Sequence, residues 1–194
     1  MTGYRDLTLY VIRHGECEHN AAGWACGHDD TPLTGKGREH ARANGRTLAE
    51  VAGDLSALDF FASPLHRTCC TMELLREAAG LPPTGYRADR RLMEGNLGDH
   101  TRLPAAEMIK LSSDSGDPWN YPRPNGESLA MIHARVGSFL ETLPRDSVIV
   151  THAGTAMVLR AHVLGLSPRQ ALGYHMPNAG LLRLSNGSEA RFGG

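Results

Sequence analysis

Two segments far apart in this chain follow one pattern, and that pattern constrains the fold more than any other feature. The apolar run 7–12 ends in Arg13-His14-Gly15-Glu16, and the apolar run 147–150 ends in Thr151-His152-Ala153-Gly154. In each segment a histidine stands where a buried strand should stop, and a glycine follows within two residues. Ligands bind outside the carboxyl ends of the strands in an open α/β sheet. The pattern therefore predicts a ligand site at one edge of such a sheet.

Apolar runs alternate with helical patterns along the rest of the chain, which is typical of a parallel sheet covered by helices. The predicted strands are 7–13, 58–62, 85–92 and 147–151, and helical patterns cover 34–51, 127–143 and 153–164. Asn186-Gly187 separates the runs 179–185 and 189–192, which is a strong hairpin signal. We expect one α/β domain over 1–194, a three-layer sandwich with a mainly parallel central sheet, helices on both faces and an antiparallel edge strand.

Three segments receive more specific predictions. Ser63-Pro64 supplies an N-cap and a first-turn proline for a helix whose inward face is Leu65, Cys69, Met72, Leu75 and Ala79. The stretch 94–126 is rich in Gly, Pro, Asp and Ser and too long for a simple connection, so we expect a lid or substrate-specificity segment at about 95–126, with a short helix near 104–111. An edge strand near 179–185 offers a contact for a possible homodimer.

The charge balance gives no reason to expect a nucleic acid or an anionic membrane as partner. The chain has 20 Lys and Arg residues against 21 Asp and Glu, a net charge of −1, so any positive field must be local. No apolar run reaches the length of a membrane span, and residues 1–12 lack the apolar core of a signal peptide. The four cysteines do not resemble a disulfide framework. We therefore expect a cytoplasmic protein with free thiols.

A phosphoryl group is the ligand that best fits the residues at the predicted strand ends. Displacement at a phosphate monoester needs a nucleophile, donors for the equatorial oxygens and an acid for the leaving oxygen. A neutral imidazole nitrogen of His14 can attack phosphorus and form a phosphohistidine, provided that an acceptor fixes the other ring nitrogen. Arg13 and Arg67 are the expected clamps, because a guanidinium fork matches two phosphate oxygens.

Further residues complete the predicted site. His152 stands before a helix N-terminus, so its ring and the backbone amides near Gly154 can face the same anion. Asn20 can donate one more hydrogen bond. Glu94 follows the third predicted strand and is the candidate acid for the leaving group and base for water. A single residue of any of these types more often has a structural role than a catalytic one. Unrelated surface residues, however, have no reason to fall together at the ends of successive strands, so the joint pattern favours a functional site.

A zinc site is the alternative for one cluster of this region. Cys17, His19, Cys26 and His28 are close in sequence, but their spacing lacks a tight Cys-x-x-Cys pair. Two arginines and two histidines can carry the charge of a phosphoryl group without a metal. We therefore expect neither a metal nor another cofactor.

Five stretches carry motifs that occur together, in one order, in a known family. They are Arg13-His14-Gly15-Glu16 with Asn20, 27–34 with Gly37, 63–68, 124–128 and 151–154. Through these motifs the chain resembles the histidine phosphatase superfamily, more specifically its phosphoglycerate mutase-like branch, over nearly its whole length. The resemblance implies a phosphohistidine at His14 and metal independence, with Glu94 as proton donor. The phosphate pocket and substrate-binding positions that it implies are Arg13, Arg67, His152, Asn20, Gly27 and Gly154.

The chain departs from the pattern of that family at several positions. Cys17 stands where Thr or Ser is usual, and His19 stands where Trp is common. The motif that follows Glu94 is shortened by about two residues relative to the family pattern. We expect a differently shaped leaving-group pocket, so the identity of the substrate does not carry over.

We expect a metal-independent phosphatase of the acid type that hydrolyses a small phosphate monoester, with a small phosphorylated metabolite as substrate. A phosphoglycerate-type phosphomutase is one alternative, although mutases of this family are generally longer. A non-catalytic module that binds a phosphorylated ligand is the other, although such a module has no need of the acid Glu94.

Overall fold

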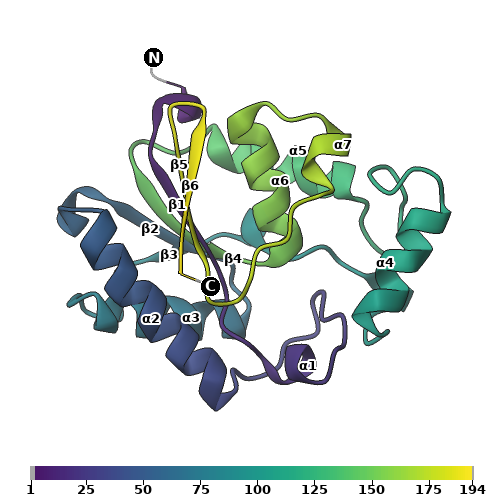
Figure 1. Ribbon diagram of the computed structural model, residues 1–194, viewed down its shortest axis with the longest axis horizontal. Coiled ribbons are helices and arrows are strands. Elements are labelled where there is room, and N and C mark those ends of the chain that lie inside the picture. The colour runs from purple at the N-terminus through teal and green to yellow at the C-terminus, as the bar shows by residue number, and fades with distance from the viewer. Residues whose placement is uncertain (1–2, 194) are drawn as a thin grey trace.

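The computed structural model describes residues 3–193, and within them six strands form one sheet in the order β3-β2-β4-β1-β5-β6 (Figure 1). The strands are β1 Leu9–Arg13, β2 Asp59–Ala62, β3 Arg87–Ala88, β4 Ser147–Thr151, β5 Leu181–Ser185 and β6 Ser188–Phe192. Strands β3, β2, β4 and β1 run parallel, whereas β5 is antiparallel to β1 and β6 is antiparallel to β5. The predicted mainly parallel sheet with an antiparallel edge is confirmed.

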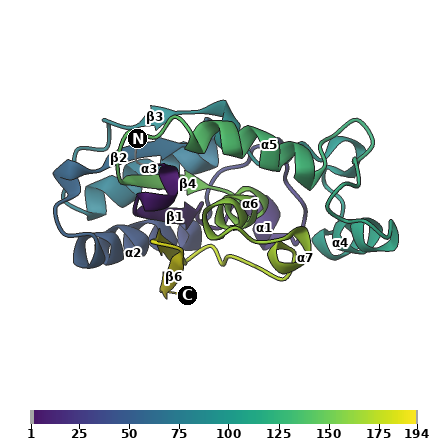
Figure 2. The ribbon, with the colours of Figure 1, turned by 90° about the horizontal axis from the view of Figure 1, so that it is seen from above.

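Helices cover both faces of this sheet, which gives the expected three layers (Figure 2). The α-helices are α1 Glu18–Ala21, α2 Gly35–Val51, α3 His66–Ala78, α4 Ala105–Asp114, α5 Leu129–Leu140, α6 Ala153–Leu164 and α7 Pro168–Ala171. One core lies between the sheet and α5 and α6, and a second lies between the sheet and α2 and α3. Among the described residues, the structure contains no helix of the length and apolarity that a membrane crossing requires.

Strand β1 faces both cores, which explains why its sequence is apolar without interruption. Leu9 and Val11 point into one core, and Tyr10 and Ile12 point into the other. A strand of a sheet that is covered on both faces has no solvent side. The carboxyl ends of β1 and β4 coincide, because Arg13 pairs with Thr151 in the ladder.

Helix α2 begins where its sequence predicts, whereas α5 is shorter than the predicted 127–143 at both ends. The hydroxyl of Thr34 accepts a hydrogen bond of 3.0 Å from the backbone N–H of Gly37 and caps α2. The hydroxyl of Ser128 accepts one of 3.2 Å from Met131 and caps α5. Strand β4 and helix α6 have the bounds expected from the sequence, 147–151 and 153–164.

The prediction for the start of α3 is wrong. Leu65 holds the N-cap position, and the helix begins at His66. The side chain of Asp30, from a distant loop, accepts hydrogen bonds from the backbone N–H groups of His66 and Arg67. The long-range carboxylate thus satisfies the free N–H groups that Ser63 was expected to cap.

The predicted inward face of α3 is also partly wrong. Met72 and Leu75 are buried as expected, but Leu65, Cys69 and Ala79 are only half-buried. The buried face instead includes the polar side chains Arg67, Thr68 and Thr71. A pattern of apolar spacing places such residues outward, whereas here Arg67 lines the cavity and the hydroxyl of Thr71 accepts from the backbone N–H of Gly15.

Two further predictions need correction. The strand expected over 85–92 is only β3, because a 3₁₀ turn at Arg90–Leu92 follows it, with Asp89 accepting from the N–H of Arg91. Strand β5 pairs on both sides, with β1 and β6, so the stretch 179–185 is not the sheet edge that a homodimer was expected to use. The antiparallel edge is β6.

The stretch 94–126 contains α4, close to the short helix expected there, and lies beside the loop that follows β1. The backbone N–H of Ala25 donates to the carbonyl of Leu103, and that of Ala105 donates to the carbonyl of Gly23, each at 2.9 Å. The indole of Trp119 is buried in the core beside α5 and anchors the end of the stretch. The loop after β1 and α4 therefore form one wall over the strand ends.

Candidate active site

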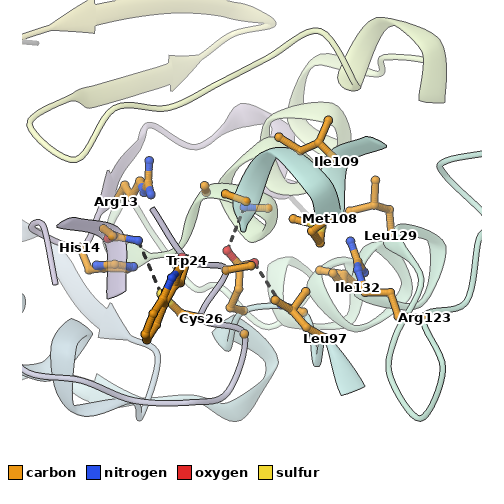
Figure 3. A pocket seen from close by; sticks show the side chains of 18 of the residues that line it. Arg13, His14, Trp24, Cys26, Leu97, Met108, Ile109, Arg123, Leu129 and Ile132 are labelled. Carbon is orange, nitrogen blue, oxygen red and sulfur yellow. Dashed lines mark hydrogen bonds between the residues drawn. The ribbon is translucent and has the colours of Figure 1, made fainter. Parts of the chain in front are cut away.

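A cavity of about 220 Å³ opens at the carboxyl ends of β1 and β4 (Figure 3). One end of this cavity is polar and carries Arg13, His14, Arg67 and Glu94. The opposite end is mostly apolar, and its walls come from the stretch after Glu94 and from α4 and α5. The apolar residues at this end are Leu97, Met108, Ile109, Leu129 and Ile132.

The ring of His14 is buried, neutral and fixed in one tautomer. Its Nδ1 lies 2.7 Å from the carbonyl oxygen of Gly15, and a carbonyl can only accept, so Nδ1 carries the proton. Its Nε2 accepts a hydrogen bond of 3.3 Å from Nε of Arg67. Burial, together with the charges of Arg67 and Arg13, lowers the pKa of His14 well below its ordinary value of 6.5. The lone pair of Nε2 is therefore available for attack.

Arg67 is fully buried and connects the polar groups of the cavity. Its Nη1 donates to the carboxylate of Asp30 at 3.0 Å and to the carbonyl of Asp29 at 3.1 Å. Its Nη2 donates to the carbonyl of Gly27 at 2.7 Å and lies 3.3 Å from Nδ1 of His152. The carbonyl and carboxylate contacts hold the guanidinium in place, and the N–H groups that face the two histidines point toward the cavity end where an anion would bind.

Arg13 has a donor without a protein partner. Its Nη1 donates to the carbonyl of Met176 at 2.8 Å, but its buried Nε has no hydrogen-bond partner among the described residues. A buried, unpartnered guanidinium N–H is costly unless a ligand satisfies it. Since Arg13 lines the cavity, this donor fits an anionic ligand.

His152 is held as the opposite tautomer. Arg67 cannot accept a hydrogen bond, so Nδ1 of His152 is the acceptor and Nε2 carries the proton. That proton is directed at the hydroxyl of Ser63, 2.9 Å away. Burial and the neighbouring charge of Arg67 lower the pKa of His152 well below 6.5. The ring centroids of His14 and His152 are 5.1 Å apart.

Glu94 sits at the cavity wall with both carboxylate oxygens held by backbone N–H groups. Oε1 accepts from Gly95 at 3.0 Å, and Oε2 accepts from Gly154 at 3.1 Å. A side chain at position 154 would collide with this carboxylate, because a Cβ there would lie 2.7 Å from Oε1. The start of α6 is therefore shaped to receive the carboxylate of Glu94.

The three expected substrate-binding positions line the cavity, but their polar groups contact the protein. The side-chain oxygen of Asn20 accepts from Asn178 at 3.4 Å, and its amide nitrogen donates to Sγ of Cys26 at 3.5 Å. Gly27 supplies the carbonyl that holds Arg67, and Gly154 supplies the N–H that holds Glu94. In this arrangement the two glycines position the charged groups of the site.

Several site residues lie outside what sequence reasoning predicted. They are Gly15, Asp30, Ser63, Arg123, Met176 and Asn178. Asp30 and Ser63 stand inside quoted motifs, a signal that could have drawn attention to them. Met176 and Asn178 follow α7 in a stretch without a motif, and only the tertiary structure brings them to β1.

The predicted site residues Arg13, His14, Arg67 and Glu94 thus line one cavity, together with Asn20, Gly27 and Gly154. His152 does not line it; its buried ring lies behind the cavity, against Arg67 and His14. The alternative zinc cluster does not assemble. His28 bonds to the carbonyl of Glu94 at 2.8 Å, and His19 lies 3.6 Å from a carboxylate oxygen of Asp29. Among residues 3–193, no group of three or more His, Cys, Asp or Glu side chains is arranged to hold a metal ion.

Comparisons with known proteins agree with this geometry. The family model described as the histidine phosphatase superfamily (branch 1) matches residues 9–191. The Erwinia tasmaniensis protein named "Probable phosphoglycerate mutase GpmB" is 30% identical over 196 residues, which cover 93% of this chain and 85% of that protein.

Solved structures of phosphatases share the fold. A mycobacterial glucosyl-3-phosphoglycerate phosphatase in complex with VO₃ is 28% identical, with a TM-score of 0.75 over 92% of each chain. The α-ribazole phosphatase of Shigella flexneri is 27% identical, with a TM-score of 0.75 over 91% of this chain and 89% of that one. The fold and the site define a protein of the phosphatase and phosphoglycerate mutase-like class. The chain belongs to branch 1 of the histidine phosphatase superfamily.

Proposed function

We propose that this protein hydrolyses a small phosphate monoester through a phosphohistidine on Nε2 of His14. One observation carries the proposal: the ring of His14 is buried and neutral, with its proton fixed on Nδ1 and its free nitrogen directed at Arg67. A structural histidine would use both ring nitrogens for permanent partners. Here the second partner is a cationic donor, which a phosphate oxygen can take over.

In the first half-reaction the phosphoryl group binds beside Arg13 and Arg67, whose guanidinium N–H groups supply donors to its oxygens. His152 positions Arg67, because its Nδ1 accepts from Nη2 of that guanidinium. Nε2 of His14 forms a bond to phosphorus while the bond from phosphorus to the ester oxygen breaks. Glu94, in its protonated form, gives its proton to the departing oxygen, so the alcohol leaves neutral.

In the second half-reaction a water molecule takes the place of the alcohol. The carboxylate of Glu94 accepts a proton from this water as its oxygen bonds to phosphorus, and the bond from phosphorus to Nε2 breaks. Inorganic phosphate leaves, and Glu94 again holds the proton that the next cycle needs. The backbone N–H groups of Gly95 and Gly154 keep the carboxylate at the same place in both steps.

The shape of the cavity supports a small monoester whose alcohol part carries apolar surface. Leu97, Met108 and Ile109 come from the stretch 95–126 and line the end away from His14. We infer that this stretch is the substrate-specificity segment of a single domain. The two solved structures named above are phosphatases of different esters, which agrees with a variable alcohol pocket beside a constant phosphate pocket.

The test is release of phosphate from p-nitrophenyl phosphate in EDTA by wild type, His14→Ala and His66→Ala. His66 is an exposed histidine of α3 and serves as the matched control. We expect turnover by wild type and by His66→Ala, and a loss of at least about a thousandfold in His14→Ala with an unchanged circular dichroism spectrum. Turnover near the wild-type rate in His14→Ala would show that His14 is not the nucleophile.

A mutase of the same class, as the name of the GpmB relative suggests, is distinguished by a second assay. Wild type is incubated with 3-phosphoglycerate, and both released phosphate and isomerised product are measured. We expect the released phosphate to exceed the isomer. Isomerisation without hydrolysis would make the protein a phosphomutase, and binding without either product would make it a binding module.

A further inference from the structure

Two thiols touch in the wall of the candidate active site. Sγ of Cys17 and Sγ of Cys26 are 3.7 Å apart, and both side chains are buried. Cys17 is the N-cap residue of the short helix α1, and Cys26 lies nine positions further along the same loop and lines the cavity. The phosphoryl-transfer chemistry described above uses neither thiol.

The pair is close to the geometry of a disulfide. The S–S bond is about 2.05 Å long, so the two sulfur atoms need to approach by less than 2 Å from their separation of 3.7 Å. Both belong to the loop between β1 and α2, outside the six-stranded sheet. The two thiols share a hydrogen bond, which lowers the pKa of Cys17 and raises that of Cys26.

The other two cysteines are arranged differently. Cys69 and Cys70 are consecutive residues of α3, and their side chains have separate partners. Sγ of Cys69 donates to the carbonyl of Ser63 at 3.5 Å, and Sγ of Cys70 lies 3.4 Å from Nε2 of His66. They provide an internal control for thiol oxidation on the same chain.

We propose that Cys17 and Cys26 are a redox modification site, which a peroxide converts to a disulfide that lowers the activity of the adjacent site. The effect on activity rests on the proposed phosphatase function, whereas the disulfide itself does not. Hydrogen peroxide is small enough to reach Cys26 through the cavity, since Cys26 is one of its lining residues.

The reaction balances with one peroxide per pair. The Cys17 thiolate attacks one oxygen of a peroxide held beside Cys26, so an S–O bond forms, the O–O bond breaks and hydroxide leaves. This hydroxide takes the proton of Cys26 and becomes water. The Cys26 thiolate then attacks the sulfenic sulfur of Cys17, the S–S bond forms, and the second hydroxide leaves and takes a proton from solvent. The two thiols lose two electrons, and the peroxide gains them.

The disulfide would act through the residues next to Cys26. The carbonyl of Gly27 holds Nη2 of Arg67 at 2.7 Å, and Asn20 donates to Sγ of Cys26 at 3.5 Å. Movement of Cys26 toward Cys17 would shift the Gly27 carbonyl away from Nη2 of Arg67. It would also move Sγ of Cys26 away from the amide nitrogen of Asn20. Arg67 in turn contacts His14 and His152, so both the nucleophile and the phosphate pocket lose their alignment.

The experiment treats the reduced full-length protein with hydrogen peroxide, quenches with catalase and alkylates free thiols without reduction. We expect a peptide pair linked through Cys17 and Cys26, protection of two thiols from alkylation, and at least a tenfold loss of p-nitrophenyl phosphate turnover that dithiothreitol restores. A Cys69→Ser/Cys70→Ser double variant should behave like wild type. The single variants Cys17→Ser and Cys26→Ser should form no such link. In each variant, peroxide should cause no loss of turnover that dithiothreitol restores, relative to the untreated sample of the same variant.

A link through Cys69 or Cys70, or sulfenic and sulfinic acids without a Cys17–Cys26 link, would overturn the proposal. A complete Cys17–Cys26 link with unchanged turnover would overturn its regulatory part. If the untreated protein shows no turnover, the proposed phosphatase function fails instead. The modification is then judged by the peptide link and by titration of inorganic phosphate, which the reduced protein should bind more tightly than the oxidised one.

Discussion

At the scale of the residue, the surroundings of His14 keep its ring neutral and its orientation fixed. The Gly15 carbonyl accepts the proton on Nδ1, and the positive charges of Arg67 and Arg13 oppose a second proton. An exposed histidine would be half protonated near pH 6.5. Because the pKa of His14 is lowered well below that value, its Nε2 favours the unprotonated form at neutral pH.

Glu94→Gln should separate substrates by their leaving groups. Glutamine keeps the shape of the side chain and an acceptor for a backbone N–H, but it cannot give a proton to the departing oxygen. We expect kcat to fall by about a hundredfold or more for an alkyl phosphate and by less than about tenfold for p-nitrophenyl phosphate, whose leaving group needs no proton. Steady-state kinetics on both esters checks this, and equal losses would place the acid elsewhere.

Gly154→Ala should reproduce that pattern without weakening the fold. The added Cβ would meet Oε1 of Glu94 at 2.7 Å, and the mobile end of the glutamate can move aside at little cost to stability. We expect a stronger loss on alkyl phosphates than on p-nitrophenyl phosphate, with an unchanged thermal midpoint. Gly173→Ala is the control, since a Cβ there meets nothing within 4 Å. Full activity on alkyl phosphates in Gly154→Ala would show that the position of this carboxylate does not matter.

At the scale of the element, the contact between α2 and α3 holds the helix that carries Arg67. Gly45 of α2 lies against the backbone of α3, and a Cβ at this position would be 2.2 Å from the carbonyl oxygen of Leu75. The close approach of the two helices therefore depends on a glycine in the middle of α2, although glycine is a poor helix former.

Gly45→Ala should destabilise the protein because two backbones would have to separate. We expect the free energy of unfolding in urea to fall by about 1–3 kcal/mol. Gly35→Ala, at the start of the same helix, is the matched control, because a Cβ there meets nothing within 4 Å. It should stay within about 1 kcal/mol of wild type, on the stabilising side. Equal stability of the two variants would contradict the close contact.

At the scale of the whole molecule, burial of neutral histidines links stability to pH. The pKa values of His14 and His152 in the folded protein are lowered well below 6.5 by burial and by Arg67. In the unfolded chain these histidines take up protons near pH 6.5. Below that pH the unfolded state therefore binds more protons than the folded state, and acid favours unfolding.

The free energy of unfolding should fall between pH 6.5 and 5 by about 1.4 kcal/mol per pH unit for each of the two histidines. Urea titrations at a series of pH values measure this slope. His133 and His175, whose pKa values burial also lowers, add to it. His152→Asn removes one titrating group and should therefore reduce the slope by about 1.4 kcal/mol per pH unit, which corresponds to one proton. An unchanged slope in that variant would mean that His152 is protonated in the folded protein.

The sequence by itself determined the strands β1 and β4, although β1 begins at Leu9 and not at Leu7, the helices α2 and α6, and the convergence of His14 and His152. These features are local: uninterrupted apolar runs mark strands buried on both faces, and a parallel sheet brings their carboxyl ends to one edge. For the same reason Arg13 and Arg67 could be assigned to the site before any contact was known.

The tertiary structure alone decided how these residues are held. Asp30 caps α3 and binds Arg67, Met176 holds Arg13, and the carbonyl of Gly15 fixes His14. The apolar pattern of α3 identified Met72 and Leu75 but missed Arg67, because burial of Arg67 is compensated by partners from loops that are distant in sequence. Sequence periodicity reports the average preference of a side chain for water, whereas the folded site supplies specific acceptors that reverse it.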